Sequence, residues 1–249
     1  MLSIVICSKN KELCDQLVAN INQTIGIPFE LDIITGAESI SQAYESGLKK
    51  SSGEFCLFLH EDVLFHTQDW GKTLLDHFNS DPFLGLISVA GSKTHTIVPS
   101  AWWDCLENDK LIRILQHKPG GQTEDQNQGF EAGKLVEVAV IDGVFMALRK
   151  KTESHFDQTL TGFHGYDLDL SLAVQEKGYK VAVIQDVLLE HFSLGNLHLG
   201  WLTALLHVHR KYKHVLPLAR GGAESSLLQE IRNISQLFKH YVNLVRKNS

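Results

Sequence analysis

Short apolar stretches alternate with helix-forming stretches along most of this chain, and the alternation restricts the possible folds more than any other feature. The apolar stretches are residues 2–7, 31–34, 55–59, 84–89 and 180–184. The stretches with helical spacing are residues 11–23, 40–50, 70–79 and 167–177. A strand that is apolar at every position, such as 55–59, needs cover on both faces. The pattern predicts an α/β fold: a mostly parallel central sheet flanked by helices, with right-handed crossovers.

Residues 93–133 depart from this alternation. They contain Trp102 and Trp103, a turn-forming stretch at 118–121 and an entirely polar run at 122–128. We interpret them as a long irregular insertion that forms an acceptor-side loop, with a disordered surface loop as the alternative. Because regular patterning returns after 133, we expect a single α/β domain over residues 1–195, followed by a helical C-terminal extension over 196–249.

The C-terminal extension contains one strongly amphipathic segment. Over residues 223–245, apolar side chains recur at alternating steps of four and three, at Leu227, Ile231, Ile234, Phe238, Tyr241 and Val245. A stripe of this length needs a partner, which is the chain's own domain, a second subunit or a membrane surface. The spacing suits helix–helix packing and the polar face carries both signs of charge, so we favour a homodimer or internal docking over peripheral membrane contact.

Composition excludes some classes of function. The formal net charge is −6 over 249 residues, which is not the basic balance of a nucleic-acid-binding domain. None of the four cysteines has a partner at C-x-x-C spacing, and Cys7 and Cys56 lie inside expected strands. We therefore expect buried thiols and a cytoplasmic protein. The start of the chain does not resemble a signal peptide, and no long apolar run predicts a membrane span, so a membrane-bound acceptor would require peripheral attachment at the inner face.

The first group of candidate site residues is His60, Glu61 and Asp62, directly after the apolar run 55–59. Ligands of open α/β sheets bind at the carboxyl ends of the strands. Two acids crowded there repel each other unless a cation neutralises them, and a hard divalent cation could also bind a diphosphate. The alternative is a solvated strand end.

Two further groups follow later in the chain. In residues 162–170, glycines precede Asp167 and Asp169 at an expected helix start, where the helix dipole favours carboxylates. An ionised carboxylate can act as a general base, although an ordinary helix cap would look the same. Glu190 and His191 follow the strand 180–184 and its loop. A lone histidine is more often structural than a ligand, and only its position favours His191.

Taken in order, these motifs resemble the GT-A glycosyltransferases, in particular the family 2-like bacterial enzymes. The resemblance covers roughly residues 2–195. It rests on the helix and strand at 41–48 and 52–63 leading into the "DXD" metal site, the sugar-pocket strand at 141–149, the "ED-x-D-L" segment at 156–157 and 165–170, and the segments 178–181 and 190–191.

The resemblance implies a GT-A (nucleotide-diphospho-sugar transferase) fold and an inverting, metal-dependent transfer of a sugar from a nucleotide-diphosphate donor to a glycan or lipid-linked acceptor. It implies Asp62 and His191 as ligands of Mn²⁺ or Mg²⁺, and Asp167 as the catalytic base with Asp169 beside it. Donor contacts are expected at Ser8, Lys9, Asn10, Glu61, Asp142 and Gly143. A UDP-sugar is the default donor because UDP is common in the family.

Three positions depart from the family pattern. The metal motif reads His60-Glu61-Asp62, and Tyr166 occupies the place of the usual acid before the catalytic aspartate. Where the family usually has acids that hold the nucleotide base, this chain reads Thr35-Gly36-Ala37-Glu38. These departures leave open a GT-A protein that has lost catalysis and acts as a binding or scaffold protein. A nucleotidyltransferase and a Rossmann dehydrogenase are disfavoured, because no glycine-rich loop follows the first strand.

Overall fold

The computed structural model describes residues 1–118, 120–131, 133–193, 195 and 197–247. Its main sheet has seven strands. In spatial order they are β10 (Leu135–Glu137), β13 (Lys180–Ile184), β5 (Leu84–Ser88), β12 (Phe145–Arg149), β3 (Phe55–His60), β1 (Leu2–Ser8) and β2 (Phe29–Thr35). Only β10 and β12 run against the others, so the sheet is mostly parallel, as predicted.

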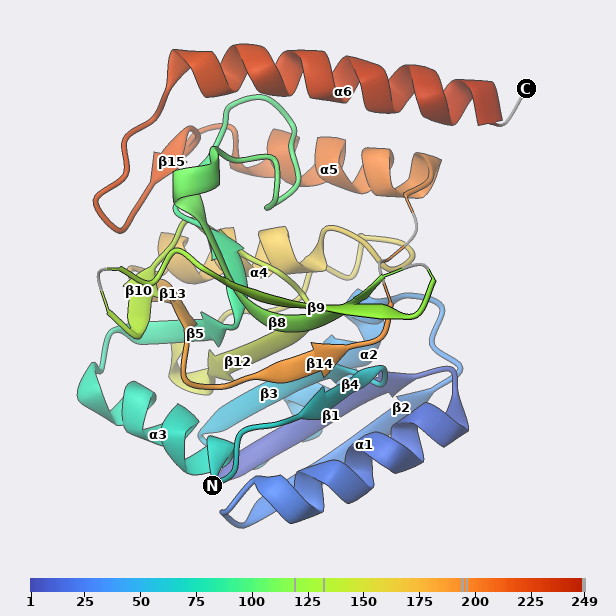
Figure 1. Cartoon of the computed structure of the whole chain (residues 1–249), viewed down its shortest axis with the longest axis vertical. Helices are drawn as coiled ribbons and strands as arrows, with labels where there is room; N and C mark the ends of the chain where they lie inside the picture. The colour runs from blue at the N-terminus through green and yellow to red at the C-terminus, as the bar shows by residue number, and fades with distance from the viewer. Residues whose placement is uncertain (119, 132, 194, 196, 248–249) are drawn as a thin grey trace.

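Helices cover both faces of this sheet (Figure 1). The α-helices within the described residues are α1 (Lys11–Thr24), α2 (Ile40–Lys50), α3 (Trp70–Ser80), α4 (Tyr166–Glu176), α5 (Leu199–Tyr212) and α6 (Leu227–Lys247). Alternate residues of β1 enter different cores: Ile4 and Ile6 pack with α1 and α3, whereas Val5 and Cys7 pack with α2. This two-sided burial explains why the central strands are apolar at every position. All four cysteines are buried and unpaired, as expected for Cys7 and Cys56.

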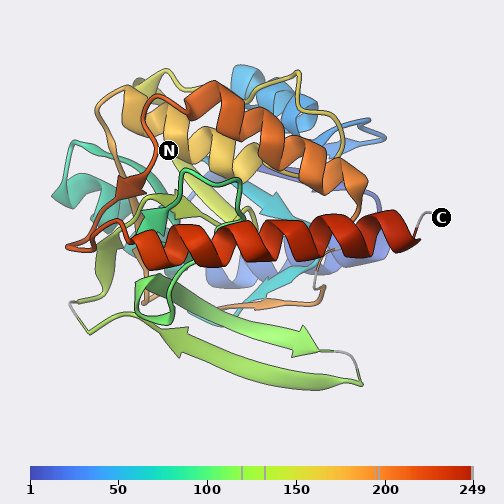
Figure 2. The same ribbon diagram turned by 90° about the horizontal axis from the view of Figure 1, so that it is seen from above.

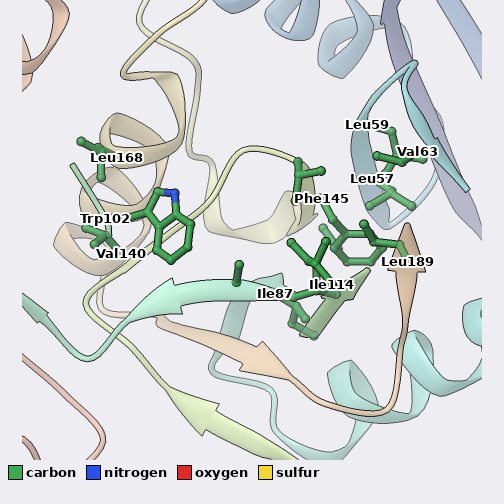
Figure 3. Close-up of a cluster of buried hydrophobic side chains, with 14 of the residues drawn as sticks. Leu57, Leu59, Val63, Ile87, Trp102, Ile114, Val140, Phe145, Leu168 and Leu189 are labelled. Carbon is green, nitrogen blue, oxygen red and sulfur yellow. The ribbon is translucent and has the colours of Figure 1, made fainter. Parts of the chain in front are cut away.

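A second sheet, which the sequence analysis missed, lies against the main one. Its strands are β11 (Val140–Ile141), β6 (Ala90–Ser92), β8 (Lys110–Lys118), β14 (Leu189–His191) and β4 (Val63–Phe65), with β9 (Gln122–Gln128) paired to β8. Figure 3 shows Phe145 of the main sheet beside Ile114 and Leu189 of the second sheet. Smaller elements are the pair β7 (Thr94–His95) and β15 (Leu218–Ala219) and the 3₁₀ turns η1 (Glu107–Asp109) and η2 (Lys150–Thr152).

The prediction that residues 93–133 form an irregular insertion is therefore wrong. Within this range β8 and β9 form an antiparallel hairpin with register from Ile112↔Gln128 to Lys118↔Gln122. The polar run 122–128 is an edge strand whose side chains are mostly exposed, so its composition gave no apolar alternation to recognise. Backbone pairing with β8 makes it a strand, and pairing depends on a neighbour rather than on its own residues.

Helix α6 lies on the outside of the molecule, over α5 and away from the sheets (Figures 1 and 2). It turns polar side chains inward: Gln229 and Asn233 are each 1% exposed and hydrogen-bond to Thr94 and Thr96. The predicted apolar stripe faces outward, with every member at least 42% exposed, from Leu227 to Val245. The alternative that the chain's own domain covers this stripe is therefore wrong. No helix in the described ranges is long and apolar enough to cross a bilayer.

Candidate functional site

Two adjoining pockets lie where β3 ends and α4 begins. The first is lined by residues that include Trp102, Trp103, Asp142, Tyr166, Asp167 and His191. The second is lined by residues that include Lys9, Ile40, Glu61, Asp62, Phe163 and His164. His60 lines both. The carboxyl ends of the strands thus converge on one site, as expected for an open α/β sheet.

Three side chains in these pockets form a candidate cation site. The ligand atoms of His60, Asp62 and His191 all lie within 4.8 Å of one another. His191 Nε2 is 3.6 Å from Asp62 Oδ2, and His60 Nδ1 is 3.9 Å from Asp62 Oδ1. The sequence analysis assigned Asp62 and His191 as metal ligands but placed His60 only in the candidate motif, although its imidazole stands two residues before Asp62.

Strand pairing explains how residues so distant in sequence meet. β14 pairs antiparallel with β4, with His191 opposite Val63, and the backbone N–H of Phe192 donates to the carbonyl of Asp62 over 3.0 Å. This register places His191 beside the end of β3. Burial lowers the pKa of His191, which favours the neutral imidazole that binds a metal.

Gln116 of β8 orients the His191 ring. Its Nε2 donates to the carbonyls of Ser193 and His191 over 2.8 and 3.2 Å, so its Oε1 is left to accept from His191 Nδ1 at 3.1 Å. The proton is thereby held on Nδ1, and the lone pair of Nε2 faces Asp62. Such outer contacts fix the tautomer and direction of a metal-binding histidine.

Gln116→Leu is expected to weaken Mn²⁺ binding by roughly 10- to 100-fold, because the replacement cannot accept the Nδ1 proton. Isothermal titration of the purified chain with MnCl₂ and UDP measures this. Thr123→Ala, on the opposite face of the same hairpin and exposed, is the control and should leave the affinity unchanged. Equal affinity in Gln116→Leu and the native chain would remove Gln116 from this role.

Tyr166 supports the other histidine. Its hydroxyl lies 2.6 Å from His60 Nε2, and its ring packs edge-on against Tyr44. Gly143 makes room for it, since a Cβ there would come within 2.2 Å of the Tyr166 hydroxyl oxygen. The tyrosine that departs from the family pattern thus contacts a candidate metal ligand, and Gly143 is required by packing as well as lining the pocket.

Asp167 lies in the first pocket as a half-buried carboxyl. Loss of solvent, together with the nearby Asp142 carboxylate, raises its pKa from 3.8 to about 7. Asp142 is itself held in place by two donors, the Trp102 indole N–H at 2.5 Å and the Val144 backbone N–H at 2.7 Å. A carboxyl that titrates near neutrality suits a general base.

Asp169, predicted beside Asp167 as a second catalytic acid, does not reach the pocket. It points the other way from α4, is fully buried, and forms an ion pair with Lys211 of α5 at 2.7 Å. Residues two apart on a helix face different directions, so only one of the two carboxylates can face the pocket. The geometry corrects the expectation: Asp169 joins α4 to α5.

The residues after β1 divide between two roles. Lys9 lines the second pocket, where its Nζ lies 3.4 Å from the centre of the Phe163 ring and its backbone N–H donates to Glu61 Oε1 over 3.1 Å. Ser8 is buried and lines a neighbouring hollow at the end of β2. The Asn10 side chain caps α1 by accepting from the Glu12 and Leu13 N–H groups. This cap explains the asparagine without any contact to a nucleotide-sugar donor.

A family profile described as "Glycosyltransferase like family" matches residues 3–198. No curated protein matches. Solved structures that resemble it include GalNAc-T7 with UDP, GalNAc and Mn²⁺, at 13% identity and a TM-score of 0.56 over 94% of this chain and 54% of that one. S. aureus TarS 1-349 in complex with UDP-GlcNAc is similar at 10% identity and a TM-score of 0.54, over 99% of this chain and 74% of that one.

A third similar structure is the mannosyltransferase PcManGT from Pyrobaculum calidifontis in complex with GDP-Man and Mn²⁺. It has 12% identity and a TM-score of 0.52, over 86% of this chain and 61% of that one. Identities this low show a common fold and no more. The chain spans about half the length of GalNAc-T7 and three fifths of PcManGT.

Proposed function

Because this chain belongs to the glycosyltransferase-like family, we propose that it moves a sugar from a nucleotide-diphosphate donor to an acceptor hydroxyl, with inversion and with the help of a divalent cation. One observation carries the proposal: His60 and His191 line the pocket that contains Asp167, a carboxyl with a pKa of about 7, and Asp62 lies beside both imidazoles in the adjoining pocket. A cation-binding cluster and a base at one pocket are what such a transfer requires.

The three metal-ligating side chains favour Mn²⁺ over Mg²⁺. Two imidazoles and one carboxylate bind transition metals well, whereas Mg²⁺ prefers an all-oxygen shell. When bound to His60, Asp62 and His191, the ion would act as a Lewis acid that stabilises the charge on the departing nucleotide diphosphate. GalNAc-T7 and PcManGT were both crystallised with Mn²⁺, which is consistent with this choice.

The chain's own residues then supply the remaining steps. The second pocket, with Lys9 and Phe163, would receive the nucleotide, and a UDP-sugar is our proposed donor. In the first pocket, Asp167 takes the proton of the acceptor hydroxyl while that oxygen attacks the anomeric carbon from the face opposite the leaving diphosphate. The anomeric centre is inverted because a single displacement occurs.

A donor screen tests the proposal. The chain is incubated with MnCl₂ and a mixture of UDP-, GDP- and CMP-sugars, and nucleotide release is followed by mass spectrometry. We expect slow, cation-dependent release of UDP from one donor without added acceptor. Release of no nucleotide from any donor would contradict the proposal. Release of GDP alone would show that the donor carries guanine instead of uracil.

The rate of transfer should depend on pH through Asp167. Its carboxyl acts as a base only when ionised, and its pKa in the folded chain is about 7. We expect kcat to rise about tenfold per pH unit below 7 and to level off above it. Single-turnover rates from pH 5.5 to 9 measure this. A flat profile across pH 7 would assign the base to another group.

We further propose that the stripe on α6 pairs with a second copy of this chain. Its six members follow a strict heptad spacing over three heptads and are exposed. Glu230 and Asn233 hold the polar face onto the body through hydrogen bonds to Ile97, Val98 and Thr96.

For the cellular location we propose the cytoplasm, at the inner face of the membrane where the acceptor is lipid-linked. The four buried, unpaired thiols are consistent with a reducing compartment.

Ile234→Glu combined with Phe238→Glu should convert a dimer to a monomer, because charges would be buried in the pairing seam. Sedimentation velocity measures the change. Asn243→Glu, exposed on the polar edge of the same helix, is the control and should stay dimeric. A native chain that is monomeric, and pellets with anionic phosphatidylglycerol vesicles only when the stripe is intact, would assign the stripe to a membrane.

A further inference from the structure

A groove extends from the first pocket along one face of the β8–β9 hairpin. Its floor comes from alternate residues of β8, including Ile112, Ile114 and Gln116. The register places Gln128, Gln126 and Glu124 of β9 directly opposite these three. Directly paired residues in a sheet share a face, so the groove has an apolar floor along β8 and a row of carboxamide and carboxylate groups along β9.

The groove and the first pocket are continuous. Both are lined by Trp102, Trp103, Asp142, His191 and Ser193. Trp102 is committed to Asp142 through its indole N–H, but Trp103 is 38% exposed and stands at the junction of the two hollows. A molecule lying in the groove would therefore pass the Trp103 ring and reach the pocket that contains Asp167.

The length of the groove indicates the size of its ligand. From Lys110 to Gln116 the floor extends over six residue-to-residue steps of strand, which is about 20 Å at roughly 3.3 Å per step. This is several times the width of one sugar ring. The groove is therefore too long for a single sugar and suits an extended chain.

The charged side chains that line the groove indicate the chemical class of the ligand. Among the described residues that line the groove, Lys110 is the only lysine or arginine, and it faces Glu107 at 3.1 Å. The carboxylate of Glu124 is paired with Lys118 at 2.6 Å. An anionic ligand would find no spare cation here and would approach the carboxylates of Asp142 and Glu124, so phosphate-, sulfate- or sialic-acid-bearing chains are disfavoured.

We propose that this groove binds the acceptor as an uncharged oligosaccharide of at least two sugars, with its terminal sugar at Asp167 and the next one against Trp103. The proposal rests on the proposed function, since it names the acceptor of that site. The partly exposed indole of Trp103 offers apolar contact for the C–H face of a sugar ring. Gln126 donates an N–H to Glu124 and Gln128 donates to Glu107, and each carboxamide oxygen can accept from a sugar hydroxyl group.

The test is binding of the labelled full chain, with UDP and MnCl₂ present, to an array of neutral glycans from one to six sugars and their sialylated and sulfated counterparts. We expect retention on neutral glycans of two or more sugars. Trp103→Ala and Gln126→Ala should each weaken that retention roughly tenfold, the equivalent of about 1.4 kcal/mol. Thr123→Ala, exposed on the opposite face of β9, should not.

Retention on charged glycans alone, equal retention on single sugars, retention on no glycan, or full retention by both groove variants would overturn the proposal. Hydrolysis of the nucleotide sugar by the native chain without acceptor distinguishes failure of the groove assignment from failure of the proposed function. If hydrolysis persists while neutral glycans do not bind, only the groove assignment fails. If hydrolysis is also absent, the proposed function fails with it.

Discussion

Asp62→Ala is expected to abolish sugar transfer, with a loss of about 10³-fold or more, because a metal-bound Lewis acid contributes several kcal/mol to stabilising the leaving group. Asp62 is the one carboxylate of the candidate cation site and lies between the two imidazoles. Its removal leaves His60 and His191 without the negative charge that a divalent cation needs.

The fold should survive this change, because the Asp62 side chain follows β3 rather than forming part of its core, and circular dichroism can confirm it. Asp76→Ala, an exposed aspartate on α3, is the matched control and should keep native transfer rates. Full activity in Asp62→Ala, or native activity in excess EDTA, would show that the reaction does not use this cluster.

Asp167→Asn is expected to lower kcat by roughly 10²-fold or more, the lower part of the range for a positioned base, while the donor KM changes little. Asparagine keeps the shape of the side chain but cannot take a proton. Asp169→Asn is the matched control, since that carboxylate pairs with Lys211 and should affect transfer only slightly. A large rise in donor KM in Asp167→Asn would place Asp167 in the donor site instead.

The same substitution should stabilise the protein above pH 7. The folded-state pKa of Asp167, about 7, lies above its ordinary value of 3.8. The folded chain therefore holds a proton that the unfolded chain has lost, and the stability from that proton disappears as pH rises from about 4 through 7. At pH 8 the native chain carries an ionised, poorly solvated carboxylate that the variant lacks. We expect a higher Tm for Asp167→Asn at pH 8 and a smaller difference at pH 5.

The main sheet could be predicted from the sequence because its central strands are buried on both faces and so carry an unbroken apolar signal. The run Phe55–His60 is an example, and the chain's fold confirms the GT-A expectation. The second sheet could not be predicted in this way. Strand β9 contains no apolar residue, and β14 has only three residues. Both exist because β8 pairs with them, a long-range relationship that periodicity does not record.

Some residues of the candidate site could likewise be predicted from the sequence and others could not. Acids at strand ends and helix starts gave Asp62 and Asp167, because that position has chemical meaning by itself. His60 was not assigned as a metal ligand because the motif was compared with a pattern of acids. Gln116 and Tyr166 contact the two histidines, and their own sequence context does not indicate those contacts, although the family pattern drew attention to Tyr166. Asp169 was expected beside Asp167 from the family resemblance, although residues two apart on a helix face different directions.

Anomalous diffraction at the manganese edge, from crystals of the full chain grown with MnCl₂ and UDP, tests the central claim most directly. We expect one strong peak in contact with Asp62 and with the imidazoles of His60 and His191, beside the diphosphate of UDP. Ordered UDP with no such peak, or a manganese peak that none of these three side chains contacts, would contradict the account.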